Sequence, residues 1–251
     1  PYGLVSNGSW ETMDSIPDEV RPYLAQIDGK RDLFGGGPLN TNICFSNKEA
    51  RNIMVQAVAD YAEKQNNVDF LHVWLSDGSF NHCECENCRK KNPSDWYMIL
   101  MNELDEEMTK RGNDMKIVFI SYVDTLWAPL KEKIKNSKRF SLLFAPIFRS
   151  YSKTLPEPLP EVELPPYEYN KSENPTSFYE ALLHLKKWEN AFPGDKISFE
   201  YRFWRVMPQD ISGLEVARRV YEDARAYEKF GVAGVIECGS PCTFFPTGLG
   251  Y

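Results

Sequence analysis

The sequence has no apolar run of the roughly 18–20 residues that a membrane-spanning helix requires, so we predict no membrane span in its 251 residues. Positive charge is also scarce: 29 Lys and Arg face 36 Asp and Glu, which gives a formal net charge of −7. Because this balance disfavours a polyanionic partner, we predict no nucleic-acid binding. No glycine-rich phosphate fingerprint follows a predicted strand, since FGGGPLN at 34–40 has no clear strand before it. We therefore predict no nucleotide or other organic cofactor.

Aromatic residues, in contrast, are abundant. They form 14% of the chain and include 13 Tyr and 6 Trp. Many must belong to the core. A surplus of Trp and Tyr near loop ends would also suit sugar rings, whose C–H faces stack on aromatic planes while their polar edges take hydrogen bonds.

The length allows one large core or two small ones, and we predict a single domain over residues 1–251. The chain begins at Pro1 rather than at a methionine and stops at FFPTGLGY. We therefore expect it to be a mature or excised piece of a longer, multidomain protein.

Strands and helices are predicted to alternate from residue 46 onward. Helix-period apolar spacing, with capping pairs such as Ser46 and Glu49, predicts helices at 46–65, 94–112, 128–136, 177–192 and 212–231. Apolar runs between them predict strands at 68–77, 115–123, 140–148, 196–204 and 232–239. Strands separated by crossovers of this length can only be parallel.

A parallel sheet leaves two alternatives, a doubly wound open sheet or a (β/α)8 barrel. Polar residues collect at the predicted carboxyl ends of the strands, namely at Asp77, Tyr122, Asp124, Arg149, Glu200, Arg202 and Glu237. Because a barrel builds its active site at that edge, we favour an α/β fold of the (β/α)8 TIM-barrel-like type. With five clear strands and a sixth candidate near YGLVS at 2–6, the barrel is expected to be incomplete in this chain.

One long segment, 152–176, is predicted to be irregular. It contains the run LPEPLPEVELPPYEYNKSENP, whose prolines and acids forbid regular structure. Because it follows a predicted strand, we interpret it as a βα-loop insertion, and favour a lid or rim over a linker between domains.

The sequence HCECENC places Cys83, Cys85 and Cys88 in a C-x-C-x2-C array. Three cysteines this close cannot all pair with one another, and the spacing suits a tetrahedral ion, so we predict a structural zinc. Cys44 is the best candidate for the fourth ligand and His82 the second. The alternative is free or disulfide-bonded cysteines, with Cys238 and Cys242 as partners. On the metal hypothesis the cluster fixes the loop that follows Asp77.

Four segments together resemble one known family: IDGKRDLF…NICFSNKEA, VWLSDGSFNHCECENC, VFISYVDTLWAP and SPCTFFPTGLGY. They are similar to the glycoside-hydrolase-like TIM-barrel family catalogued as a domain of unknown function, DUF 4838, which is related in fold to α-glucuronidases and hexosaminidases. The family pattern of a GKR turn, a cysteine, a strand ending in Asp and a C-x-C-x2-C block falls on residues 29–31, Cys44, Asp77 and the cysteines from Cys83 to Cys88.

The resemblance implies a bacterial protein that is secreted, with an extracellular, periplasmic or cell-surface location. The chain departs from the family at two points. The segment SNGSWETMDS lacks the histidine that many relatives carry, and the usual Asp-Asn is Asp77-Gly78 here. Either departure implies a different sugar or lost activity.

A glycosidase needs two carboxyl groups on either side of the scissile bond, about 5–5.5 Å apart for retention and about 6.5–9.5 Å for inversion. We predict Asp77 as the first catalytic candidate, Glu237 as the second and Glu200 as the third. If the strand at 196–204 is regular, Glu200, Arg202 and Trp204 share one side, toward the barrel mouth. The alternative for each acid is a solvated strand end or a buried ion pair, such as Glu200 with Arg202.

Further residues are candidates for substrate binding. Arg149 and Tyr151 could hold a carboxylate or hydroxyl of the substrate, and an arginine there hints at an acidic sugar. Tyr122 could stack on a sugar ring, and His82 could point into the cleft if it is not a metal ligand. The full predicted set is Arg149, Tyr151, Tyr122, Arg202, Trp204 and His82.

The leading functional prediction is a carbohydrate-active enzyme that hydrolyses glycosidic bonds of an oligosaccharide or polysaccharide with paired carboxylates. The first alternative is a non-catalytic carbohydrate-binding barrel, which would keep the aromatic residues without a well-placed acid pair. A zinc-dependent hydrolase requires an open coordination position, so four sulfur ligands would exclude it. A nucleotide-binding α/β protein is the weakest alternative, for want of a phosphate loop.

Overall fold

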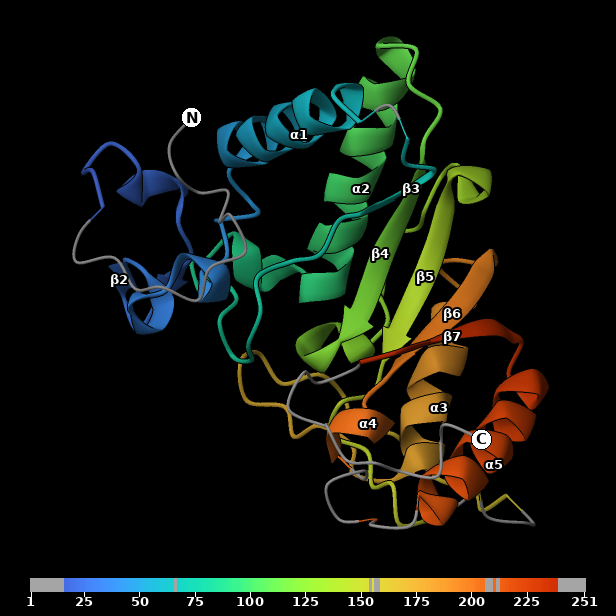
Figure 1. Cartoon of the computed structure of the whole chain (residues 1–251). Coiled ribbons are helices and arrows are strands. Elements are labelled where there is room, and N and C mark those ends of the chain that lie inside the picture. The colour runs from blue at the N-terminus through green and yellow to red at the C-terminus, as the bar shows by residue number, and fades with distance from the viewer. Residues whose placement is uncertain are drawn as a thin grey trace.

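A five-stranded parallel sheet forms the centre of the computed structural model, which describes residues 16–238 apart from 66, 154, 156–158, 206–209 and 211–212 (Figure 1). Its strands are β3 (Phe70–His72), β4 (Lys116–Tyr122), β5 (Phe140–Ala145), β6 (Asp195–Glu200) and β7 (Val232–Glu237), paired in the order β3-β4-β5-β6-β7. A small antiparallel hairpin, β1 (Gln26–Ile27) and β2 (Lys30–Arg31), precedes them.

Five α-helices accompany the strands in the described part of the chain: α1 (Lys48–Glu63), α2 (Pro93–Lys110), α3 (Phe178–Trp188), the single turn α4 (Arg202–Arg205) and α5 (Leu214–Lys229). Short 3-10 turns lie at Arg21–Tyr23, Phe34–Gly36, Pro38–Asn40, Cys88–Lys90, Val123–Leu126 and Ser137–Arg139. Among the described helices, none has the length and apolar character needed to cross a membrane.

The sheet is wound in one direction, because each strand pairs with the next one along the chain. A doubly wound sheet would reverse this order at a switch point. Right-handed crossovers therefore place α2, α3 and α5 on the same face of the sheet. The predicted mixed α/β fold with a parallel sheet is confirmed.

The predicted barrel, which was expected to be incomplete in this chain, is shown only as a parallel sheet with helices. The sheet is open, since β3 and β7 each pair with only one strand of the described region. It is nevertheless strongly curved: the ring of Trp74, just beyond β3, lies 5.9 Å from that of Phe199 on β6. Side chains three strands apart on a flat sheet would be separated by about 14 Å. The architecture is thus an open, curled sheet with its concave face opposite the helices.

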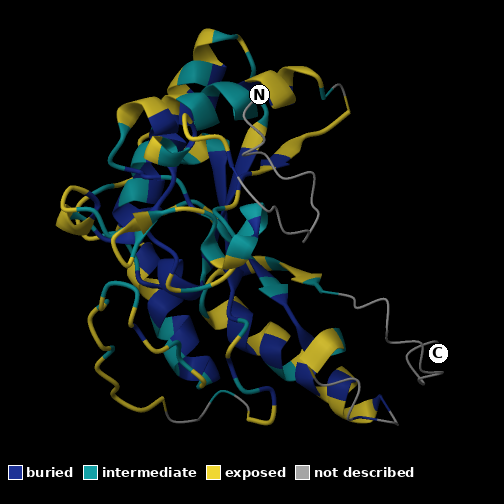
Figure 2. Ribbon diagram, turned by 90° about the vertical axis from the view of Figure 1, so that its left-hand side faces the viewer, coloured by how far each residue is buried: buried dark blue, intermediate teal, exposed yellow. Residues whose placement is uncertain are grey.

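The core fills the space between this sheet and its helices. Phe119 on β4 lies at its centre, with its ring within 5.0–6.1 Å of the rings of Tyr97, Phe140, Trp188 and Phe192. Figure 2 shows the buried residues concentrated along the strands and the inner sides of the helices. Burial of these side chains, at about 25 cal/mol per Å² of apolar surface, is the main stabilising contribution.

Side-chain caps begin α1 and α3, with one shift from the prediction. Asn47, not Ser46, caps α1, because its side chain accepts hydrogen bonds from the main-chain N–H groups of Glu49 and Ala50. Ser177 caps α3 as predicted, accepting from the N–H of Glu180. Ser212 lies outside the described residues.

The predicted helix at 128–136 does not form. Two polar side chains of α2 take over its backbone hydrogen bonds instead. Asp95 accepts from the N–H groups of Lys131 and Glu132, and Asn102 accepts from Lys135 and donates to the carbonyl of Lys133. The segment therefore lies against α2 as irregular chain. The described residues of 152–176 likewise contain no helix or strand.

We expect stability to fall in acid through His184 on α3. Its ring packs 4.7 Å from that of Trp127, and burial lowers its pKa from 6.5 to about 4. Because the folded-state pKa lies below the unfolded value, this group's contribution is fully present above about pH 6.5 and is lost as the pH falls toward about 4. The loss amounts to about 3 kcal/mol.

Urea unfolding of the wild type and of His184→Gln at about pH 7 and about pH 4 measures this contribution. The variant should lose about 3 kcal/mol less stability than the wild type between the two conditions. Equal losses in both proteins would show that His184 is not held neutral by burial.

Candidate metal centre and strand-end site

Four cysteines meet at one buried point of the structure. The Sγ atoms of Cys44, Cys83, Cys85 and Cys88 all lie within 4.8 Å of one another. Cys44 Sγ is 3.7 Å from Cys85 Sγ and 3.8 Å from Cys88 Sγ. Four thiolates bound to one zinc at about 2.3 Å would be about 3.8 Å apart along the edges of the tetrahedron. The cluster therefore has the ligand number and spacing to bind a metal ion such as zinc.

The surroundings of the cluster direct hydrogen-bond donors at its sulfur atoms. Main-chain N–H groups of Gln26 and Ser46 donate to Cys83 Sγ and Cys88 Sγ, each at 3.3 Å. The guanidinium of Arg31 donates to Cys83 Sγ at 3.8 Å. Hydrogen bonds from the Cys83 and Cys88 thiols hold the pKa of Cys44 well below its usual range, and the same contacts with Cys44 raise the pKa of Cys83 and of Cys88. These donors offset the negative charge that four thiolates would leave around a divalent ion.

The cluster joins segments that are far apart in the sequence. Cys44 precedes α1, the other three cysteines follow β3, and the β1–β2 hairpin lies over them. All five cysteines in the described region, including Cys238, carry free thiols, and Cys242 lies outside that region. His82 is not part of the cluster, so Cys44 is the fourth member of the set, as the first choice from sequence predicted.

A chain of amides leads from the cluster's loop to Asp77. Asn81, two residues before Cys83, donates to the carbonyls of Asn40 and Asp77 and to Ser76 Oγ. Asn42, two residues before Cys44, donates to Asn81 Oδ1 and accepts from the N–H of Ser76. Because each of these two amides stands two residues before a cysteine, the hydrogen bonds tie the main chain at Ser76 and Asp77 to the segments that carry the cluster.

The 167–172 segment closes over the same region. Tyr169 donates to the carbonyl of Cys83, and Asn170 bonds the main chain of His82 in both directions. Tyr167 donates to Asp124 Oδ1, and Asp124 Oδ2 lies 3.8 Å from His82 Nε2. His82 is buried, and burial lowers its pKa. It therefore lies in the wall behind the site rather than in an open cleft.

Asp77 itself lies at the carboxyl edge of the sheet and is half-buried. Its Oδ1 accepts from the hydroxyl of Tyr122 at 3.1 Å and from the N–H of Gly78 at 2.8 Å. Burial raises the pKa of Tyr201, and the charges of Tyr122 and Asp77 act in the same direction. Residues at or beyond the ends of β3, β4 and β6 form what we call the strand-end site: Asp77, Tyr122, Tyr201, Trp204 and Arg205.

Aromatic rings continue from this site along the concave face. Successive ring centroids lie 5.9 Å apart from Trp74 to Phe199, 5.2 Å from Phe199 to Tyr201 and 6.0 Å from Tyr201 to Trp204. Trp74 is 42% exposed and Trp204 44% exposed. The row therefore offers open aromatic surface at both of its ends.

Backbone strain gathers around the same two features. The non-glycine residues with positive φ in the described chain are Asp28, Phe80, Val123 and Asn170. Asp28 turns the hairpin over the cysteines, and Asn170 holds the loop beside them. Phe80 (φ 60°) and Val123 (φ 48°) lie in the turns after Asp77 and Tyr122. A left-handed Val or Phe costs on the order of 1–3 kcal/mol, and such strain is typical of functional sites.

Glu200 and Glu237 lie in a different environment, a buried ionic network between β5, β6, β7 and α5. Arg149 Nε donates to Glu200 Oε2 at 3.2 Å and the guanidinium also bonds Asp223. Arg202 bonds Asp223 Oδ2 at 2.6 Å and Glu237 Oε1 at 2.8 Å. We refer to Arg149, Glu200, Arg202, Asp223 and Glu237 as the arginine–carboxylate network.

Accessibility separates the three predicted acids. Glu200 is 0% exposed and also accepts from the hydroxyl of Tyr227 on α5. Burial raises the pKa of Glu200, while Arg149 and Arg202 oppose that shift. Glu237 is partly exposed, at 22% of its side chain, yet its Oε1 is held by Arg202. Of the three carboxyl groups, Asp77 alone is half-open without an arginine partner in the described chain.

The structure thus divides the predicted substrate-binding residues. Tyr122 and Trp204 lie at the strand-end site with Asp77, while Arg149 and Arg202 are buried in the arginine–carboxylate network. Tyr151 is buried beneath the site, where its hydroxyl accepts from the N–H of Tyr201. Three participants were not found from the sequence: Asp223, Tyr201 and Arg205. The sequence signal for Tyr201 and Arg205 was their position near the end of a predicted strand. Asp223 had no such signal.

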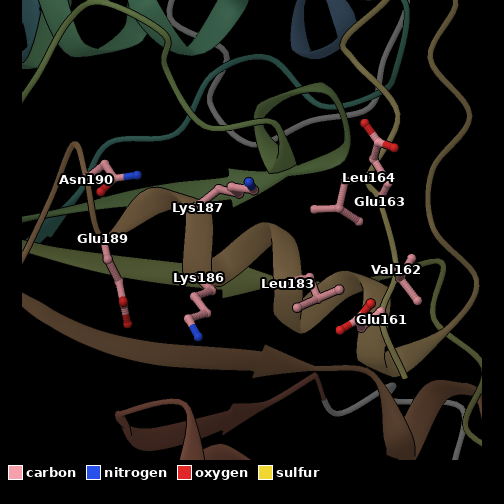
Figure 3. A pocket seen from close by; sticks show the side chains of 9 residues that line it. All are labelled: Glu161, Val162, Glu163, Leu164, Leu183, Lys186, Lys187, Glu189 and Asn190. Atoms are coloured by element: carbon pink, nitrogen blue, oxygen red, sulfur yellow. The ribbon is translucent and has the colours of Figure 1, made fainter. Parts of the chain in front are cut away.

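A separate surface groove of about 880 Å³ lies between the 161–164 segment and α3 (Figure 3). As Figure 3 shows, α3 contributes Lys186 and Lys187 to its walls and the facing segment contributes Glu161 and Glu163. None of the predicted site residues lines it. The groove has no cluster of convergent polar groups tied to the strand ends. We therefore base the functional argument on the strand-end site.

Comparison with known proteins gives one match. No curated protein and no solved structure matches the chain. A family model described as a domain of unknown function, DUF4838, matches residues 7–177. The matched part contains the four cysteines, Asp77 and Tyr122, and ends before Trp204, Arg205 and most of the arginine–carboxylate network. Because the match spans more than half of the 251 residues, the chain belongs to the DUF4838 family.

Proposed function

We propose that this chain recognises a carbohydrate at the strand-end site and along the adjoining concave face. The observation that carries the proposal is the row of rings from Trp74 to Trp204, open at both ends and flanked by Asp77. Sugar rings stack on such surfaces through their C–H faces, and aromatic residues supply most of the contact area. No organic cofactor is needed for this role.

Asp77 supplies the polar contact in this proposal. Its Oδ1 is fixed by Tyr122 and Gly78, so the carboxylate is held in one orientation before a ligand arrives. A held carboxylate can accept hydrogen bonds from sugar hydroxyls at little further cost in side-chain entropy. The fixed acid would therefore orient the sugar, and the aromatic rings would supply contact area.

Binding without hydrolysis fits the distribution of charge better than catalysis does. A glycosidase needs two reachable carboxyl groups, and Glu200 is enclosed by Arg149 and Tyr227. Hydrolysis of the bound sugar is the second candidate function. It is favoured by Glu237, whose side chain is 22% exposed and whose Oε2, itself a buried atom, has no hydrogen-bond partner in the described region.

We further propose that the four cysteines hold a structural zinc ion. Four protein sulfurs complete a tetrahedral coordination sphere and leave no position for a reacting water, which disfavours a zinc-dependent hydrolase. The ion would tie together the segment before α1 and the loop after β3. Its task would be to keep Asp77 in place through the Asn42 and Asn81 amides.

Substitution of Asp77 by asparagine tests the proposed site. Calorimetry with short neutral and uronate-containing oligosaccharides should show binding to the wild type that weakens by about tenfold or more in Asp77→Asn, since a charge-assisted hydrogen bond is lost. Asp114→Asn is the control, because Asp114 is an exposed acid just before β4, at the opposite edge of the sheet.

The same mixtures, assayed for new reducing ends, separate the two candidate functions. Binding without bond cleavage supports the recognition role. Cleavage that disappears in both Asp77→Asn and Glu237→Gln would establish the hydrolase instead. If no oligosaccharide binds the metal-loaded wild type, carbohydrate recognition at this site is wrong.

A further inference from the structure

Arg205 is an exposed cation at the mouth of the strand-end site. It belongs to α4, the single turn that follows β6, and its guanidinium lies 4.5 Å from the centre of the Trp204 ring. Figure 1 shows α4 beyond the carboxyl ends of the strands. Stacking on the indole limits the directions in which the guanidinium can point.

This arginine has no carboxylate partner in the described part of the chain. Most arginines there do, including the buried Arg149 and Arg202. Arg31 is also without one, but it serves the cysteine cluster. Arg225 is the third such arginine and lies on α5 near Tyr221, away from the strand ends. In a chain with 36 acidic residues and 29 basic ones, an unpaired cation beside a candidate site is informative.

The charges of Arg205 and Asp77 both affect the pKa of the Tyr122 phenol. Burial raises the pKa of Tyr122, Asp77 raises it further, and Arg205 opposes both. Asp77 and Arg205 therefore both lie close enough to Tyr122 for their charges to be felt. A ligand that contacts both Asp77 and Arg205 would meet a hydrogen-bond acceptor in the one and a planar double donor in the other.

We propose that the strand-end site selects a glycan that carries a carboxylate, a uronic acid, and that Arg205 binds this carboxylate while Trp204 stacks on the sugar ring. The inference rests on the proposed carbohydrate recognition and adds the substrate class. The fork of an arginine matches the two oxygens of a planar carboxylate, and such bidentate pairs are among the stronger hydrogen bonds. The net charge of −7 repels acidic ligands in general, so the preference must come from this local contact.

The test compares ligands that differ only in the carboxyl group. Binding of an oligogalacturonate and of its carboxyl-reduced form, an oligogalactose, is measured on the metal-loaded protein, together with the equivalent glucuronate pair. The wild type should prefer the acid form by about tenfold to a hundredfold. Arg205→Gln should abolish the preference, so that the acid and reduced forms bind with similar affinity, and Arg205→Lys should retain part of it. Arg225→Gln is the matched control and should behave as the wild type.

The outcomes keep the two proposals apart. If the wild type binds acid and reduced forms equally, or if Arg205→Gln keeps the preference, the acidic-sugar inference is overturned while carbohydrate recognition stands. If a sulfated oligosaccharide binds better than the uronate through Arg205, the carboxylate assignment is overturned. If neither member of any pair binds, carbohydrate recognition itself fails, and this inference with it.

Discussion

Cys88→Ser is expected to release the bound metal and to lower the melting temperature by about 6–12 °C. Cys88 is 1% exposed, lies 3.8 Å from Cys44 Sγ and accepts from the N–H of Ser46. A serine cannot replace the thiolate, so the four-sulfur site loses a ligand. Structural zinc contributes directly to folding free energy, and a loss on the order of 3 kcal/mol corresponds to this shift in a chain of this size.

The matched control is Cys238→Ser. Cys238 is a free cysteine at the end of β7 and is not part of the cluster. Elemental analysis should find one zinc per chain in the wild type and in this control, and much less in Cys88→Ser. Cobalt substitution would add the absorption of a tetrahedral thiolate complex. Full metal content in Cys88→Ser, or an equal loss in the control, would contradict the four-cysteine centre.

Metal loss should also weaken sugar binding, although the proposed ion would not contact the sugar. Asp77 is held through Asn81, two residues before Cys83, and through Asn42, two residues before Cys44. When the loop loosens, the carboxylate loses its fixed orientation, and ligand binding must restore that order. Binding to Cys88→Ser below its melting temperature should therefore be weaker than binding to Cys238→Ser.

The metal cluster could be predicted from the sequence because three of its ligands are local. The C-x-C-x2-C spacing from Cys83 to Cys88 requires no knowledge of the fold. Cys44 required only that the segment before α1 return to the loop after β3. Asp77 could be placed at the sheet edge because a parallel strand ending in an acid puts it there.

The location of Glu200 could not be predicted in the same way, because it depends on where β6 ends. The sequence pattern extends the strand to Trp204, and alternation then places Glu200, Arg202 and Trp204 together on the open side. In the structure β6 stops at Glu200 and α4 begins at Arg202. Glu200 instead shares the helix-facing side with Ser198, where both contact Tyr227 of α5. The alternation of side chains along a strand does not by itself show which face of the strand is covered by helices.

How far the predicted, incomplete barrel extends could not be read from the sequence for a related reason. Alternating strands and helices specify a parallel sheet and the hand of its crossovers, but the number of strands depends on the chain that supplies them. Five strands curl enough to bring Trp74 to Phe199, yet leave the edges of β3 and β7 unpaired in the described region. Likewise, residues 128–136 were suitable for a helix, but the side chains of Asp95 and Asn102 bond the main-chain groups that a helix would have used. The local sequence does not reveal this competition.

Asp223→Asn is expected to destabilise the protein by about 3–5 kcal/mol, which corresponds to about 6–20 °C in melting temperature. Asp223 is 1% exposed and accepts from both Arg149 and Arg202. The amide keeps the size of the side chain and removes its charge, so both guanidinium groups lose a buried counter-ion. Breaking a buried ion pair from one side is costly because the remaining charge cannot reach water.

Glu106→Gln provides the contrast, since it breaks the ion pair with Lys135, whose side chains are 65% and 71% exposed. An exposed pair is worth about 0–1 kcal/mol, so this variant should melt within about 4 °C of the wild type. Thermal unfolding followed by circular dichroism measures both. A mild effect of Asp223→Asn would mean that the arginine–carboxylate network is dispensable for folding. Glu200 would then regain its place as a catalytic candidate, whereas a large effect assigns Glu200 to the framework that supports the strand-end site.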